Sequence, residues 1–205
     1  MFAIVESGSI TSMPQGNKGI TIGDNQYPSD IFTTKWTESE RNAIGVYTVE
    51  IDDTNQKDET FYYNTGITYT FGSGKVTGTY GTATAKSLND IKWTQEEIDA
   101  DPSEAPAGAD TNTIKVRGLK RIYKEKFNLE AAALLAKTDW YVVKATEVES
   151  YNVPSSVTTY RTGVRSKINS METAIDNCSD IAALETLLSY KTGTRPLGEF
   201  PDEVV

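Results

Sequence analysis

Two stretches of helical periodicity between Leu119 and Cys178 constrain the fold of this chain more than any other feature of its sequence. In both stretches, apolar residues recur at spacings of four or three, which is the period of an amphipathic helix with one buried stripe. The two stripes consist of Leu119, Tyr123, Phe127, Ala131 and Leu134, and of Val157, Tyr160, Val164, Ile168, Met171, Ile175 and Cys178. Because each helix alone would leave its stripe exposed to water, the sequence predicts that the two pack on each other as a helical hairpin.

A short connector that carries Lys137–Tyr141 joins the two predicted helices. We expect the ring of Trp140 to close the end of the seam, with its N–H bonded to a backbone carbonyl. An ion pair between Asp139 and either Arg161 or Arg165 would hold the hairpin closed. The alternative is that the three charges are solvated, in which case a pair contributes only about 0–1 kcal/mol.

The second stripe also has the alternating spacing of four and three that is typical of a coiled-coil seam. Two alternatives therefore stay open: the seam is shared between chains, or it packs within one chain against the first helix. A third helix is predicted over Ile181–Tyr190, and from Thr192 the Gly and Pro content predicts an extended tail. We expect Leu197 and Phe200 in this tail to anchor it in a groove of a neighbouring molecule.

The first half of the chain has the patterns of short strands, with strict apolar–polar alternation over Val46–Ile51. Gly72–Gly74 predicts the tightest turn of an antiparallel sheet. Capping boxes that begin at Thr37 and Thr94 predict two short helices. Other extended segments are expected over Phe2–Val5, Ser9–Met13, Gly19–Gly23, Tyr27–Phe32, Thr60–Tyr63, Ile67–Phe71 and Lys75–Tyr80.

These patterns predict an α+β fold with two domains. A small antiparallel β-rich domain is expected over residues 1–100, followed by a Pro- and Ala-rich linker over 101–112. A helical domain over 113–205 would then hold the helical hairpin, the third helix and the extended C-terminal tail.

Charge and residue usage narrow the function classes. The net charge of −9 disfavours nucleic acid as a direct partner, because the chain would repel phosphate backbones. No apolar run approaches the roughly 20 residues that span a bilayer, so no membrane partner is expected. The N-terminus has no charged region followed by a long apolar core, so we expect synthesis in the cytoplasm without a signal peptide.

The sequence contains no histidine, which removes the commonest general base and metal ligand. The densest acidic cluster, Asp52, Asp53, Asp58 and Glu59, does not have the alternate ligand spacing of an EF-hand loop. Gly72–Gly74 is not followed by the lysine and helix of a phosphate-binding loop. We therefore expect no enzymatic activity, no cofactor and no metal site.

Residues around the connector resemble the C-terminal signature of the tail-fibre assembly proteins and tail assembly chaperones of tailed bacteriophages. The match consists of two leucines, a Thr-Asp-Trp, a variable connector, a Tyr-Arg pair and a further arginine. The residues that carry it are Leu134, Leu135, Thr138, Asp139, Trp140, Tyr160, Arg161 and Arg165. The segments Met1–Val5 and Ala43–Tyr47 also resemble openings of marine-phage proteins, although the chain continues past Arg165 further than the family's pattern.

The resemblance implies a non-enzymatic structural protein of the virion, in the tail or fibre-attachment region. We expect it to contact other tail or fibre proteins and to form a homo-oligomer. One alternative is a tail-fibre assembly chaperone that is absent from the mature particle, and another is a carbohydrate-binding module for host recognition that uses Tyr62 and Tyr69. The expected interaction and structural residues are Trp140, Asp139, Tyr160, Arg161, Arg165, Leu197 and Phe200.

Overall fold

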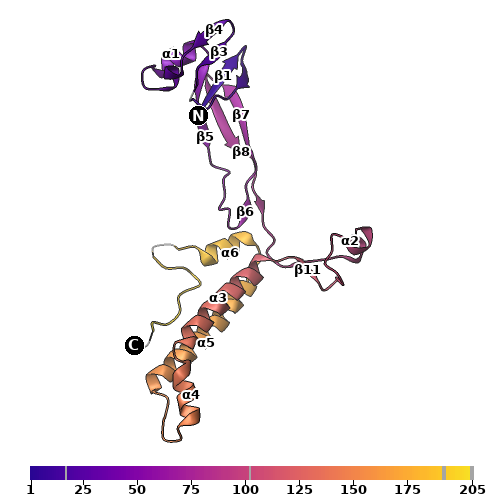
Figure 1. Ribbon diagram of the computed structural model, residues 1–205, viewed down its shortest axis with the longest axis vertical. Helices are drawn as coiled ribbons and strands as arrows, with labels where there is room; N and C mark the ends of the chain where they lie inside the picture. Colours follow the sequence, from indigo (N-terminus) through magenta and orange to yellow (C-terminus); the bar gives the residue numbers. More distant parts are fainter. Residues whose placement is uncertain (17, 102, 191–192, 204–205) are drawn as a thin grey trace. The chain divides into compact units, whose positions relative to one another are not determined.

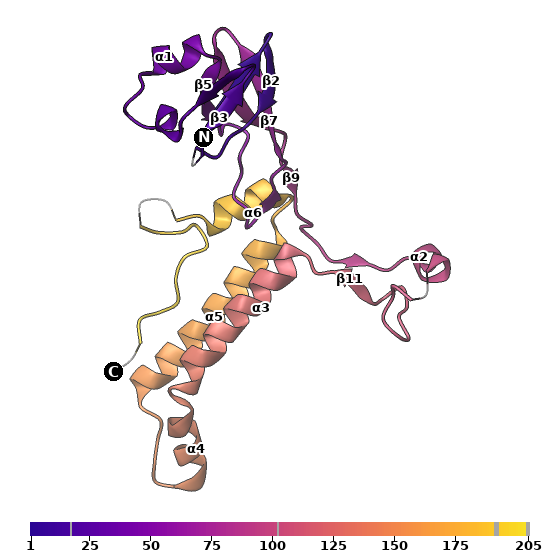
Figure 2. The same cartoon turned by 45° about the horizontal axis from the view of Figure 1, so that its top comes forward.

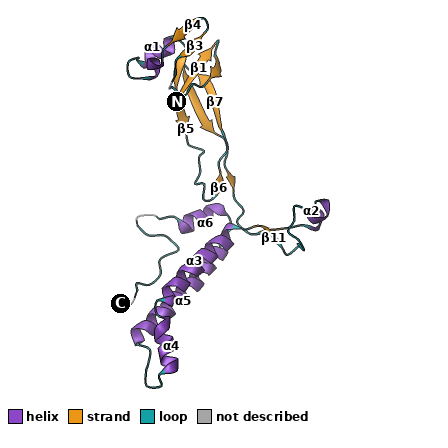
Figure 3. Cartoon of the chain, in the orientation of Figure 1, coloured by secondary structure: helices purple, strands orange, loops and turns teal. Residues whose placement is uncertain are grey.

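The computed structural model describes residues 1–16, 18–101, 103–190 and 193–203. The chain divides into two compact units, Met1–Thr84 and Ala85–Val205. Strands dominate the first unit and helices the second, so the predicted α+β class is confirmed (Figure 1, Figure 3).

A five-stranded sheet with the order β2-β1-β5-β8-β7 forms the first unit. Its strands are β1 (Phe2–Glu6), β2 (Ser9–Ser12), β5 (Val46–Asp52), β7 (Ile67–Gly72) and β8 (Lys75–Tyr80). Smaller ladders join β3 (Ile20–Ile22) to β4 (Asn25–Tyr27) and β6 (Tyr62–Tyr63) to β9 (Thr84–Ala85). The predicted Gly72–Gly74 turn is confirmed: Ser73 and Gly74 both have positive φ, at 52° and 75°, as a two-residue hairpin turn requires.

One pair of the sheet departs from the predicted antiparallel arrangement, because β5 and β8 run parallel. The tight turn forces β7 and β8 into an antiparallel hairpin, and β7 takes the outer position. The strand next to β5 is therefore β8, which runs in the same direction and brings Val76 beside Val49. Both valines are buried, so the parallel pair joins two core residues.

Alternate side chains of the sheet enter two separate apolar clusters, as the two-residue period of strands requires. Ala3 and Val5 belong to one cluster, whereas Ile4 between them belongs to the other. The first cluster is Ala3, Val5, Val49 and Val76, packed by Ile10, Met13, Tyr47, Tyr69 and Phe71. The second is Ile4, Ile31 and Val46, packed by Phe2, Ile20, Ile22, Tyr27, Phe32, Trp36 and Ile44.

Two helical turns accompany the second cluster. The capping box of α1 (Glu38–Ala43) is confirmed, since Thr37 and Glu40 bond reciprocally. The predicted extension of Tyr27–Phe32 is wrong over its second part, where Ser29–Phe32 form the 3-10 helix η1. Proline restricts the residue before it, and Tyr27 is indeed in β4. The residues after Pro28 are free to turn, and this turn buries Ile31 completely.

The second unit begins with a small module of two strands and a helix, β10 (Ile91–Lys92), α2 (Gln95–Ala100) and β11 (Ile114–Val116). The boundary between units lies after Thr84, so the predicted boundary at 101–112 is displaced. Residues 101 and 103–112 lie in a loop whose flanks are joined by the β10–β11 ladder. They therefore lie inside one unit, and Pro102 of the predicted linker lies outside the described residues.

Glu97 makes this module sensitive to acid. Its carboxylate accepts from the Lys115 amine at 2.7 Å and from the backbone N–H of Thr94 at 3.0 Å, and these bonds lower the pKa of Glu97 from 4.5 to about 2. A lowered folded-state pKa contributes stability that is complete above pH 4.5 and is lost as the pH falls towards 2. We expect the fluorescence of the buried Trp93, whose ring lies 4.6 Å from the Lys115 amine, to report this loss.

The matched variant is Glu97→Gln in a chain whose other two tryptophans are phenylalanine. This variant should be less stable at neutral pH and should lose the part of the acid transition between pH 4.5 and 2 that belongs to Glu97. Equal acid transitions in the variant and its Glu97 parent would contradict the assignment.

The predicted helical hairpin is confirmed as α3 (Leu119–Ala136) packed on α5 (Ser155–Asp176), which lie side by side in Figure 2. Every predicted stripe residue of α5 is buried, and Val164, Met171 and Ile175 are completely inaccessible. The seam is therefore buried within one chain, which supports the intrachain alternative. Homo-oligomerisation through this seam stays an untested prediction.

The chain after α5 folds back on the same unit. Asp180 caps α6 (Ile181–Leu188) by accepting from the backbone N–H of Ala183 at 2.8 Å. Leu197 is buried, its N–H donates to the Leu187 carbonyl at 3.1 Å, and its carbonyl accepts from Lys167 at 2.7 Å.

These bonds correct the prediction that Leu197 anchors the tail in a neighbouring molecule, because Leu197 is already buried in its own chain. Phe200 is half-buried. Pro201 lies next to Gly163 of α5, and a side chain at position 163 would press against the Pro201 ring. Thr192, where the tail was expected to begin, lies outside the described residues.

Candidate functional site

The turn between the hairpin helices carries an additional helix, α4 (Asp139–Glu147), at the end of the hairpin (Figure 1). None of its residues is buried. Trp140 is 53% exposed, so the prediction that it closes the seam is wrong. Asp139 and Trp140 begin a new helix instead of an irregular connector, and this turns the indole away from the seam.

Four large apolar side chains are exposed within nine residues of the chain here, and we call them the tip patch. They are Trp140, Val142, Val143 and Val148. Single exposed apolar residues are normal on protein surfaces, whereas several within one short segment make that segment a candidate interaction site. A nine-residue helix is marginal without packing partners, so α4 itself would gain from being covered.

Aromatic contacts hold the tryptophan of the tip patch in place. The Trp140 and Tyr141 ring centroids lie 3.9 Å apart. The Lys144 amine lies 5.7 Å from the Trp140 ring and 4.3 Å from the Tyr151 ring. Such cation–π contacts contribute about 0.5–1 kcal/mol at exposed sites. They orient the indole before any partner arrives, which lowers the entropic cost of docking.

Arg161 of α5 bonds to the junction between α3 and α4. Its Nη1 donates to the Leu135 carbonyl at 2.8 Å and to the Thr138 hydroxyl at 2.7 Å, and it pairs with Asp139 at 2.8 Å. Arg161 and Thr138 are both buried. The predicted pair with Asp139 is thus confirmed for Arg161, and these bonds determine where α4 starts.

Arg165, one turn further along α5, is exposed, and within the described ranges it forms no ion pair. Together with Arg161 it lines a small cavity of about 270 Å³ between α4, the following loop and α5. The remaining lining residues are Val142, Val153, Thr158 and Thr162. Two arginines of α5 and two valines are therefore among the residues that line the cavity.

Tyr160 has a structural position. Its side chain is buried in the α5 stripe, and burial raises the pKa of its hydroxyl, with the Glu203 carboxylate as a smaller cause. Over the described residues, its hydroxyl has no hydrogen-bond partner. The tail passes nearby, where Glu203 pairs with Lys137. Tyr160 therefore lies between the hairpin and its tail, away from the tip patch.

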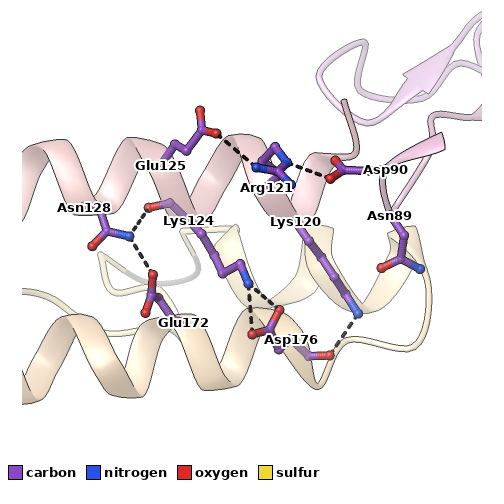
Figure 4. Close-up of a pocket in the computed structure, with 9 residues that line it drawn as sticks. All are labelled: Asn89, Asp90, Lys120, Arg121, Lys124, Glu125, Asn128, Glu172 and Asp176. Atoms are coloured by element: carbon purple, nitrogen blue, oxygen red, sulfur yellow. Dashed lines mark hydrogen bonds and ion pairs between the residues drawn. The ribbon is translucent and has the colours of Figure 1, made fainter. Parts of the chain in front are cut away.

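A second hollow, of about 520 Å³, lies at the other end of the hairpin and is lined by charged side chains (Figure 4). Arg121 pairs with Asp90 at 2.6 Å, and Lys124 pairs with Asp176 at 2.8 Å. Lys120 donates to the Asp176 carbonyl at 2.9 Å, where α5 ends. Because these cations are occupied by groups of the same chain, the hollow joins α3 to α5 and offers no open charge to a ligand.

The other candidates have structural explanations. Tyr69, considered for sugar stacking, packs against the first apolar cluster of the sheet. Asp52 accepts from the Thr54 backbone N–H at 3.0 Å, as in a local turn. Across the part of the chain that the structure describes, no group of three or more His, Cys, Asp or Glu side chains could hold a metal ion.

Sequence reasoning missed most of the tip patch. Val142, Val143 and Val148 lie outside both helical stripes, and the signal that could have found them is three valines close to a tryptophan in an otherwise polar segment.

Among the described residues, no helix is long and apolar enough to cross a membrane. Comparison with family models, curated proteins and solved structures finds no match to this chain.

Proposed function

We propose that this chain is a non-enzymatic structural protein that docks on another protein through the tip patch. The observation that supports the proposal is the exposure of Trp140, Val142 and Val143 on a helix with no buried residue, and of Val148 directly after it. Tryptophan anchors of this kind dominate the binding energy of many protein interfaces. The buried Arg161 holds the patch at a defined position on a rigid hairpin.

The assembly we propose is the tail or fibre-attachment region of a tailed bacteriophage, with another tail or fibre protein as the partner. The resemblance noted in the sequence supports this choice. Several of its residues are joined in the structure, because Arg161 bonds to Leu135, Thr138 and Asp139. A shared signature would then preserve the geometry that presents Trp140.

The test is incorporation into virus particles produced with altered chains. The double variant Trp140→Ser with Val143→Ser should reduce incorporation at least about tenfold, since loss of hot-spot residues typically costs more than 1 kcal/mol each. The matched control is Leu129→Ser, which removes an exposed leucine of α3 (72% exposed). Thermal melting should change little in either variant, because the side chains are largely exposed. Equal incorporation of the double variant and the control would contradict docking through the tip patch.

The second candidate is a tail-fibre assembly chaperone, which the same joined residues Arg161, Thr138 and Asp139 also favour. The two functions differ in where the chain is found. A structural protein is present in mass spectra of purified particles, whereas a chaperone is present in infected cells and absent from particles. Absence from particles together with Trp140-dependent binding to a fibre protein would establish the chaperone.

A further inference from the structure

We infer that the cavity beside α4 binds a carboxylate group of the docked partner, next to a branched apolar side chain. The inference deepens the proposed function and rests on it for the identity of the partner as a protein. Its basis is that Arg161 and Arg165, one turn apart on α5, both line a cavity of about 270 Å³.

The arginines differ in how much of their bonding capacity is used. Arg161 directs Nη1 at Leu135, Thr138 and Asp139, whereas its Nε and Nη2 have no acceptor among the residues that the structure describes. Arg165 is exposed, and its guanidinium has no acidic partner within the same residues. A planar guanidinium fork matches a carboxylate in two parallel hydrogen bonds, and these are among the strongest in proteins.

The other residues that line the cavity favour an apolar side chain next to the carboxylate. Val142 and Val153 provide apolar contact, and Thr158 and Thr162 add hydroxyls one turn apart on α5. The Thr158 hydroxyl already donates to the Pro154 carbonyl at 3.3 Å. Val142 also belongs to the tip patch, so the cavity adjoins the patch at this residue. A partner segment with an Asp or Glu beside a Leu or Val would occupy both.

Charge makes this cavity distinctive. The chain carries a net charge of −9, and Arg121, Lys124 and Lys137 of the hairpin are paired with acids of the same chain. Asp139 compensates the charge of Arg161, so Arg165, which has no ion pair among the described residues, gives this cavity a net positive charge on an acidic protein. Charged groups of this kind determine which partner is accepted more than how tightly it is held.

The test uses the full chain with ¹⁵N-labelled arginine, observed by NMR during titration with isovalerate, a carboxylate with a branched apolar end. We expect saturable shifts of the Arg161 and Arg165 Nε signals with a Kd of about 1 mM, as is reasonable for so small a ligand. The uncharged isostere isovaleramide should bind at least about tenfold more weakly, because it lacks the charge-assisted bonds.

Variants locate the binding on the protein. Arg165→Gln should weaken isovalerate binding at least about tenfold, whereas Lys92→Gln, which removes an exposed charge from β10, should leave binding unchanged. Inorganic phosphate that binds as tightly as isovalerate would overturn the carboxylate assignment. Absence of saturable shifts, or equal binding of the amide, would overturn the site itself.

The two proposals fail in different ways. If isovalerate binds as expected but the Trp140 and Val143 variant still enters particles, the proposed function is wrong and the cavity assignment stands. If tip-patch variants abolish incorporation but isovalerate does not bind, only the cavity assignment is wrong.

Discussion

Replacing Arg161 with methionine is expected to destabilise the helical unit by about 2–4 kcal/mol, because charge-assisted hydrogen bonds to buried groups are lost. The methionine fills similar space but leaves the Thr138 hydroxyl without its donor and removes the partner of Asp139. Urea unfolding followed by far-ultraviolet circular dichroism measures the change. Because α4 begins at this junction, the substitution should also speed the exchange of the α4 amide protons more than that of the α3 amide protons.

The control for this prediction is one helical turn away. Arg165→Met removes the same charge from the same helix, but Arg165 is exposed and has no ion pair among the described residues. Its effect on the free energy of unfolding should stay within about 0.5 kcal/mol. Equal destabilisation by the two variants would mean that net charge matters here, and not the bonds that Arg161 makes.

Replacing Phe127 with alanine should have the largest effect on stability, about 3–5 kcal/mol, which is the usual cost of removing a buried aromatic side chain. Phe127 is 1% exposed on the face of α3 that packs against α5. The Arg195 guanidinium lies 4.8 Å from its ring, so the substitution also removes a contact with the tail. Because the total stability of a domain is only about 5–15 kcal/mol, the helical unit should unfold at a much lower temperature.

The sheet of the first unit should survive this substitution, since its two apolar clusters contain no residue of the helical unit. Hydrogen exchange with mass spectrometry resolves the two units. We expect faster exchange across α3 and α5, with unchanged protection of β1 and β5. The control Leu129→Ala, on the exposed side of α3, should leave both units unchanged. Simultaneous loss of protection in both units would show that they unfold as one.

Local chemistry explains the parts of the fold that were predictable. The stripes of α3 and α5 follow from a period that is intrinsic to the helix, so Val164, Met171 and Ile175 could be assigned to the core before any contact was known. The capping boxes of Thr37 and Thr94 and the turn at Ser73 and Gly74 involve residues three or fewer apart. Each of these features depends on neighbours in the chain.

The candidate site was predictable only in part. Asp139, Arg161 and Arg165 were recognised as a group, but their spacing does not distinguish which arginine takes the aspartate. Both arginines lie on one side of α5, four residues apart. The choice depends on where α3 ends, because the Leu135 carbonyl and the Thr138 hydroxyl lie within bonding distance of Arg161.

By itself, the sequence determined that this chain forms a β-rich unit and a helical hairpin, because periodicity, caps and turns act over a few residues. Tertiary structure alone decided that β8 lies beside β5, that Leu197 is buried against its own chain and that Trp140 is left exposed. These outcomes depend on which surfaces meet across long separations in the chain. Leu197 is packed against its own chain, whereas Trp140 is largely exposed. The tip of the hairpin is therefore the surface that we expect a partner to cover.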